Sequence, residues 1–157
     1  MKKLTLMLVL CLAVMTGAAY AETNELHLAA KHGDLVTVTK LLTGNNMKMT
    51  VNAVDENGFT PLMYASIIGD VKISEMLIEN GADVNAQNQS GATALMLAAK
   101  YNHLKLCKKL VKSGANAKLK TTNRQTAFTI ASQYGNLEVA DYLAQVTNRS
   151  FIKATYF

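Results

Sequence analysis

The chain has 157 residues, of which 50% are apolar and 17% are charged. This length is enough for one domain with a sizeable core, and the composition excludes a disordered polyelectrolyte. The formal net charge is +5, or +3 without Lys2 and Lys3 at the N-terminus. This charge is mild, whereas a nucleic-acid-binding protein would concentrate more basic charge on one face.

The N-terminal segment 1–21 has the pattern of a secretory signal peptide. Lys2 and Lys3 give a positive start, residues 4–14 are apolar, and residues 19–21 (AYA) place small side chains around a cleavage site. The apolar run is short for a membrane span, which makes an uncleaved anchor the weaker alternative. We therefore expect a mature domain of residues 22–157 that is free of the membrane and lies in a bacterial periplasm.

An internal repeat of nearly constant length runs through most of the remaining chain. Several columns recur at a step of 33 in the numbering: Leu62, Leu95 and Phe128; Ala65, Ala98 and Ala131; Leu77, Leu110 and Leu143. An earlier copy at residues 26–34 matches residues 62–70 at an offset of 36, so the first repeat carries three extra residues within the loop 43–50. The repeats therefore lie at about 22–56, 57–89, 90–122 and 123–150, followed by a tail at 151–157.

Each repeat is expected to contain two short helices. In the second repeat, Thr60 is a good N-cap and Pro61 suits the first helical turn, which predicts a helix over 61–68 that ends at Gly69. A second helix is predicted over about 71–79, stopped by Gly81. No single repeat can bury its own apolar face, so the repeats must stack into an all-α solenoid, with end repeats that differ from the rest.

The residues at 60–65 (TPLMYA) and 80–86 (NGADVNA) resemble the ankyrin repeat, and residues 91–95 (GATAL) follow the same pattern more loosely. The resemblance covers residues 22–147, nearly the whole mature chain. It implies an ankyrin-repeat solenoid of four stacked helix–turn–helix repeats with finger loops that project to one side.

The sequence shows no set of residues suited to catalysis or metal binding. His27, His32 and His103 lie in different repeats, and the resemblance implies that His27 and His103 are structural. Cys107, the only cysteine outside the signal peptide, shares a column with Ser74, which predicts a small buried side chain and an inert thiol. We expect no catalytic residue, no metal and no cofactor.

The resemblance also implies that binding occurs on the concave face, made of finger tips and the outward side of each first helix. The matching positions in the fingers are Glu56, Asn57, Phe59, Gln89 and Gln125, and those on the helices are Lys31, His32, Ile67, Ile68, Lys100, Tyr101, Gln133 and Tyr134. Aromatic and branched apolar members of this set occupy columns that a stable stack leaves polar, which predicts a continuous surface that anchors a protein. The alternative is that Ile67 and Ile68 pack against neighbouring fingers.

A single repeat domain without a catalytic site can act only by occupying a partner. Small exported bacterial ankyrin proteins, which the chain resembles, imply two roles: one kind holds a periplasmic enzyme such as a cell-wall endopeptidase inactive, and the other supports a periplasmic catalase. We favour an inhibitor or self-protection protein, monomeric when free, that binds an exported enzyme and no nucleic acid. A periplasmic stabiliser or chaperone and a secreted effector that binds a host protein are the alternatives. The tail at 151–157 is either a cap on the fourth repeat or a binding arm.

Overall fold

The computed structural model describes residues 25–43 and 51–156, with side chains up to residue 148. The predicted signal peptide at 1–21 and the loop insertion at 44–50 lie outside the described residues. Within the described ranges, the chain forms helices and turns without strands.

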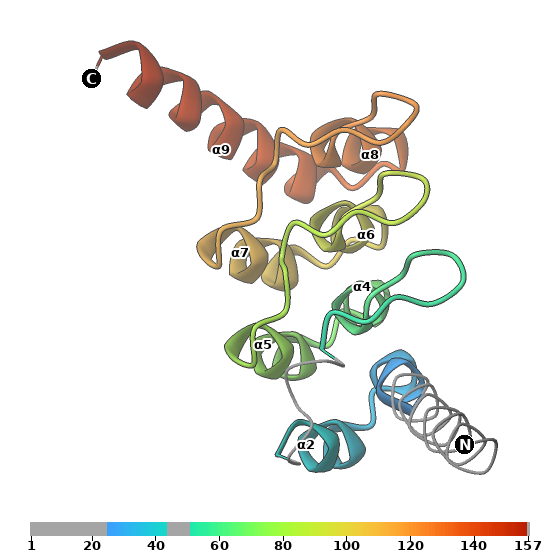
Figure 1. Ribbon diagram of the computed structural model, residues 1–157. Helices are drawn as coiled ribbons and strands as arrows, with labels where there is room; N and C mark the ends of the chain where they lie inside the picture. Colours follow the sequence, from blue (N-terminus) through green and yellow to red (C-terminus); the bar gives the residue numbers. More distant parts are fainter. Residues whose placement is uncertain (1–24, 44–50, 157) are drawn as a thin grey trace, which may run out of the picture.

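The helices stack in two columns, with the finger loops projecting beyond one of them (Figure 1). Residues 25–32 are helical, and the further helices are α2 (Leu35–Thr43), α4 (Pro61–Ile68), α5 (Val71–Glu79), α6 (Ala94–Lys100), α7 (Leu104–Lys112), α8 (Ala127–Gln133) and α9 (Leu137–Tyr156). Within repeats, α4 packs on α5, α6 on α7 and α8 on α9. Between repeats, α4, α6 and α8 form one column, and α2, α5, α7 and α9 form the other. This is the predicted all-α ankyrin-repeat solenoid.

The first helix of each later repeat begins at the predicted N-cap. The side chains of Thr60, Thr93 and Thr126 accept hydrogen bonds from backbone N–H groups three residues later, which satisfies one of the otherwise unpaired donors of each helix. A left-handed residue follows each of these three helices: Gly69 at φ +84°, Asn102 at φ +62° and Gly135 at φ +74°. The predicted bounds of 61–68 and 71–79 are confirmed.

The core consists of the columns that recur from repeat to repeat. The alanine column at 65, 98 and 131 is fully buried because small side chains let the paired helices approach closely. Leucines of the second helices fill the space between neighbouring repeats: Leu77, Leu110 and Leu143 are fully buried. Burial of this kind drives the stacking, since each repeat supplies the apolar surface that its neighbour needs.

The last repeat differs from the others on its outer face, as expected for an end of a solenoid. Met63 and Met96 are buried between repeats, whereas the equivalent Thr129 is exposed. Ala99 is fully buried, whereas the equivalent Ser132 is exposed. Polar side chains thus replace apolar ones where no further repeat follows.

Side chains also join neighbouring repeats through backbone carbonyls. His27 donates from Nε2 to the carbonyl of Phe59, and His103 donates from Nε2 to the carbonyl of Ile67, each over 2.9 Å. Asn136, in the column of His103, donates to the carbonyls of Ala99 and Lys100 at 2.8 Å. The structural roles predicted for His27 and His103 agree with these contacts.

Helix α9 runs through the predicted boundary between the fourth repeat and the tail. The sequence interpretation closes the fourth repeat at residue 150 and treats 151–157 as a separate tail, whereas α9 continues without a break to Tyr156. It has 20 residues, against nine in α5 and α7, and it projects past the stack in Figure 1. None of the helices in the described part of the chain is long and apolar enough to cross a membrane.

Candidate protein-binding surface

Three side chains at the ends of the first helices form a partly exposed column. Ile68 is the last residue of α4, and Tyr101 and Tyr134 are the C-cap residues of α6 and α8. Their exposed fractions are 42%, 45% and 53%. We call these three residues the anchor column. Each sits at the same place in its repeat, so the repeat period itself aligns them along the stack.

Lys100 lies between the two tyrosines of the anchor column. Its Nζ atom is 5.4 Å from the ring centroid of Tyr101 and 5.2 Å from that of Tyr134. Both distances are within the range of a cation–π interaction, in which the ammonium is attracted to the electron-rich face of the ring. The half-buried Lys100 therefore bridges the third and fourth repeats.

The backbone beneath the anchor column is held in place by the contacts between repeats. Asn136 binds the last carbonyls of α6, at Ala99 and Lys100. His103 binds the carbonyl of Ile67, and its ring lies 6.5 Å from that of Tyr101 at an interplanar angle of 26°. Because these groups are fixed before any partner arrives, little conformational entropy would be lost on binding.

A second cluster forms around Tyr64, nearer the N-terminal end of the described chain. The Tyr64 hydroxyl donates to Oδ2 of Asp55 over 2.6 Å. The Tyr64 ring packs 5.4 Å from the ring of Phe59 and 6.0 Å edge-on from that of His27, and the Lys31 ammonium lies 5.7 Å from it. Phe59 is consequently half-buried, while Lys31 remains exposed.

The hydrogen bond between Asp55 and Tyr64 shifts the ionisation of both groups. Hydrogen bonding to Asp55, followed by burial, raises the pKa of Tyr64 to about 12. Burial alone would raise the pKa of Asp55, but the hydrogen bonds from Tyr64 and from the amides of Phe59 and Asn57 outweigh it and lower that pKa. The pair therefore favours a charged carboxylate and a neutral phenol.

The other predicted site residues divide into those that bond within or between repeats and those whose side chains are exposed. Gln89 donates from Nε2 to the carbonyl of Glu56 over 2.7 Å, and Gln125 donates to Oε1 of Gln133 over 2.6 Å. Ile67 is half-buried, as the packing alternative expected, but its neighbour Ile68 is exposed. The side chains of His32, Glu56, Asn57 and Gln133 are also exposed.

The sequence interpretation did not include Tyr64. Its column holds Leu97 and Ile130 in the next two repeats, and both are buried, so the column predicted packing. An aromatic hydroxyl in a column of aliphatic residues was the available signal.

The described residues offer less for a metal ion or a small molecule than for a protein partner. No group of three or more His, Cys, Asp or Glu residues in the described part of the chain could hold a metal ion. Burial raises the pKa of the Cys107 thiol to about 12, and the side chain is fully buried. An open depression of about 280 Å³ lies between α7 and α9, lined by Leu104, Lys108, Glu138, Asp141, Tyr142 and Gln145. It is open to solvent and lacks the apolar enclosure that small-molecule sites have.

Comparison with known proteins places these repeats in a family. A family model described as "Ankyrin repeats (3 copies)" matches residues 7–88, 26–121 and 80–154, which together cover most of the chain. The first match begins inside the segment predicted to be a signal peptide.

Among curated proteins, human "Ankyrin repeat family A protein 2" is 34% identical over 70 residues, which are 45% of this chain and 21% of that protein. "Palmitoyltransferase akr1" of Schizosaccharomyces pombe is 43% identical over 61 residues, or 39% of this chain and 9% of that protein. "Inversin" of Gallus gallus is 41% identical over 61 residues, which are 39% of this chain and 5% of that protein. The matches thus span about a fifth or less of the length of these relatives. The chain belongs to the ankyrin-repeat family, whose repeats serve as protein-binding modules.

Proposed function

We propose that the chain is an exported, non-catalytic protein that binds and inhibits an enzyme in the bacterial periplasm, such as a cell-wall endopeptidase, and so protects the cell that makes it. The observation that carries the binding part is the anchor column with Lys100 between its two tyrosines. Tyrosines that are exposed yet rigidly held are typical of residues that dominate the binding energy of an interface.

Inhibition suits this architecture because an inhibitor needs only one binding surface, which covers the active site of its target. A module that covers an active site requires a rigid, partly apolar face, and the helix ends supply one through side chains spaced by the repeat. The palmitoyltransferase relative shares only 9% of its length with the match to this chain, so its activity gives no support for an enzymatic role here.

Export is supported by the charged, apolar and small-residue pattern of residues 1–21. The remaining cysteine, Cys107, is fully buried, which is compatible with an oxidising compartment because a buried neutral thiol reacts slowly.

The proposal is tested by capture followed by an activity assay. The purified protein is immobilised and exposed to periplasmic extract, in parallel with a Tyr101→Ala/Tyr134→Ala variant and with Leu137→Ala, a control that removes an apolar side chain 71% exposed outside the anchor column. We expect the wild type and the control to retain the same enzyme and the double variant to lose it.

The captured enzyme is then assayed with increasing amounts of the purified protein. Activity that falls to zero at a stoichiometric ratio supports inhibition. Unchanged activity with a longer enzyme half-life would overturn inhibition and favour the role of a stabiliser. Capture that does not depend on Tyr101 and Tyr134 would move the interface away from the anchor column.

A further inference from the structure

Charge is divided along the length of the stack. Residues 51–83 contain six acidic residues and one basic residue, whereas residues 84–136 contain eight basic residues and no acidic one. The third repeat and the start of the fourth are therefore strongly positive, although the net charge of the whole chain is mild. A division of this kind acts on the orientation and the rate with which a charged partner approaches.

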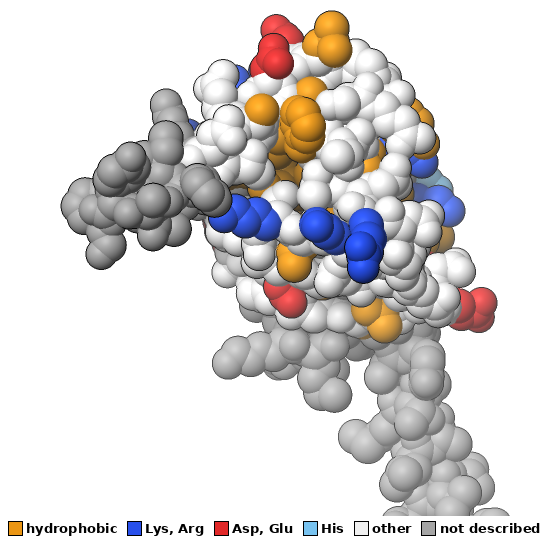
Figure 2. Space-filling view, turned by 90° about the horizontal axis from the view of Figure 1, so that it is seen from above, with side chains coloured by type: hydrophobic (Ala, Val, Ile, Leu, Met, Phe, Trp, Pro, Cys, Tyr) orange, Lys and Arg blue, Asp and Glu red, His pale blue; other side chains and the backbone are white. Residues whose placement is uncertain are grey.

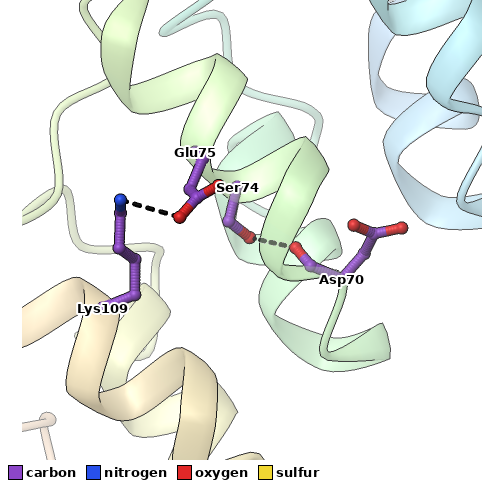
Figure 3. A network of polar contacts seen from close by, with 4 residues as sticks. All are labelled: Asp70, Ser74, Glu75 and Lys109. Atoms are coloured by element: carbon purple, nitrogen blue, oxygen red, sulfur yellow. Dashed lines mark hydrogen bonds and ion pairs between the residues drawn. The ribbon is translucent and has the colours of Figure 1, made fainter.

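On the side formed by the second helices, acidic neighbours lie beside two of these basic residues. Lys109 of α7 forms an ion pair with Glu75 of α5, with 2.7 Å between Nζ and Oε1 (Figure 3). Lys108 lines the depression between α7 and α9 together with Glu138 and Asp141. Two lysines of α7, Lys108 and Lys109, thus have acidic side chains of α9 and α5 beside them, which reduces their attraction for an external anion. The Lys108 ammonium also lies 5.8 Å from the ring centroid of Tyr142.

The binding face lacks such compensation around Lys100. The pair Lys109–Glu75 is the single ion pair within the described residues, so the Lys100 ammonium faces two tyrosine rings and no carboxylate there. Asp55, in the first finger, already accepts hydrogen bonds from the Tyr64 hydroxyl and from two backbone amides. A different face, the end of the stack at the fourth repeat, also carries Lys and Arg side chains in a row, with apolar side chains nearby (Figure 2).

We propose that the partner presents an acidic protein segment to the third and fourth repeats, with one of its carboxylates paired to Lys100 and an apolar side chain seated on the anchor column. This inference rests on the proposed protein-binding function. It adds that the bound segment of the partner is acidic and that it contacts the third and fourth repeats. An ammonium held between two rings is partly desolvated, and a charge-assisted hydrogen bond to a carboxylate is stronger there than in open water.

A protein segment fits this face better than a nucleic acid. The apolar Ile68 and the exposed Glu56 lie on the N-terminal side of Lys100 in the sequence of repeats. A nucleic acid that continued in that direction would bring its phosphates to the acidic second repeat, which would repel them. A polypeptide avoids this repulsion because the sign of its charge can change along its length.

The test uses a random dodecapeptide library displayed on phage and selected on the purified protein. Enriched peptides are synthesised with a fluorescent label, and their affinities are measured by anisotropy for the wild type, Lys100→Gln and Lys105→Gln. Lys105 is the matched control because it is an exposed lysine of the same repeat on the second helix. A single-stranded DNA dodecamer is measured in parallel.

We expect enriched peptides to carry several Asp or Glu residues and at least one apolar side chain. Lys100→Gln should weaken their binding by about tenfold, as for the loss of a charge-assisted hydrogen bond, while Lys105→Gln should change it by less than about twofold. Enrichment of neutral or basic peptides, no enrichment at all, equal losses in both variants, or tighter binding of the DNA would each overturn the inference.

Tyr101→Ala separates the inference from the function on which it rests. Neutral peptides whose binding depends on Tyr101 would leave the anchor column as a protein-binding surface and remove only the acidic partner. Peptides of any charge whose binding is indifferent to Tyr101 would instead count against the proposed location of the interface.

Discussion

The imidazole of His103 lies directly against Gly69, across the boundary between the second and third repeats. Gly69 follows α4 in the left-handed conformation at φ +84°, and a Cβ atom at this position would overlap the imidazole ring. The same imidazole donates to the carbonyl of Ile67, two residues before Gly69. The end of α4, where Ile68 is exposed, is therefore fixed by a contact that only glycine permits.

Gly69→Ala should destabilise the protein by clearly more than the ~1–2 kcal/mol of a left-handed alanine, because His103 must also move. Gly81→Ala is the matched control, since Gly81 has a similar φ of +91° and no atom within 4 Å of an added Cβ. Urea unfolding of both variants measures the difference in the free energy of unfolding. Equal costs at the two glycines would contradict the packing described for His103.

Tyr64 should ionise later than the other tyrosines in an ultraviolet titration. Its pKa is raised to about 12, mainly by the hydrogen bond to Asp55, so the stability that this bond supplies is present below pH ~10 and is lost as the pH rises towards 12. Tyr64→Phe should remove the late step, and Asp55→Asn should move it to lower pH. If Tyr64→Phe instead removed a tyrosine that ionises near pH ~10, the usual value, the hydrogen bond between Tyr64 and Asp55 would not persist in solution.

The hydrogen-bonded pair of Asp55 and Tyr64 also predicts that the stability of the protein falls at acidic pH. The pKa of Asp55 is lowered in the folded protein, so its contribution to stability is present above pH ~4 and is lost as the pH falls through the lower, folded-state value. Asp55→Asn should flatten the fall in the melting temperature at acidic pH relative to the wild type.

Cys107 should be unreactive towards thiol reagents until the protein unfolds. Its side chain is fully buried and burial raises its pKa to about 12, so labelling at neutral pH should be more than about 100-fold slower than in denaturant. Rapid labelling of the folded protein would contradict the packing of α7.

Cys107→Ser should cost less than about 1 kcal/mol, because a serine hydroxyl can bond to the carbonyl four residues earlier. The equivalent Ser74 is fully buried and does this, donating to the carbonyl of Asp70 over 2.7 Å (Figure 3). Cys107→Asp, which buries an unpaired charge, should cost more than about 3 kcal/mol.

Export predicts that the protein recovered from cells begins at Glu22. Sequencing the N-terminus of protein isolated from the periplasmic fraction measures this directly. Protein that retains Met1 and sediments with membranes would refute the signal peptide.

The register of the repeats was sufficient to predict the solenoid, because equivalent positions in successive repeats lie in the same structural environment and carry similar residues. Thr60 as an N-cap, Gly69 and Asn102 as left-handed residues and Cys107 as a buried side chain all follow from that register. The position of Lys100 between two rings did not follow, since the direction of a long side chain depends on the neighbouring repeat as well as on its own column.

The sequence carries a signal for the length of α9 that the repeat boundaries did not use. Gly81 and Gly114 follow the second helices of repeats two and three in the left-handed conformation, but the equivalent residue in repeat four is Thr147. Thr147 instead donates its hydroxyl to the carbonyls of Leu143 and Ala144 within α9. Without a glycine at this position, the helix continues.

The central claim, that the anchor column binds a protein partner, is tested most directly by measuring stability and affinity on the same variants. Tyr101→Ala and Tyr134→Ala should each weaken binding of the captured partner by about 1–3 kcal/mol and lower the free energy of unfolding by only about 0.5 kcal/mol. Leu110→Ala, which empties a fully buried site, should cost about 2–5 kcal/mol of stability and leave the affinity of the folded fraction unchanged. Tyrosine variants that unfold readily while their folded fraction binds normally would contradict the claim.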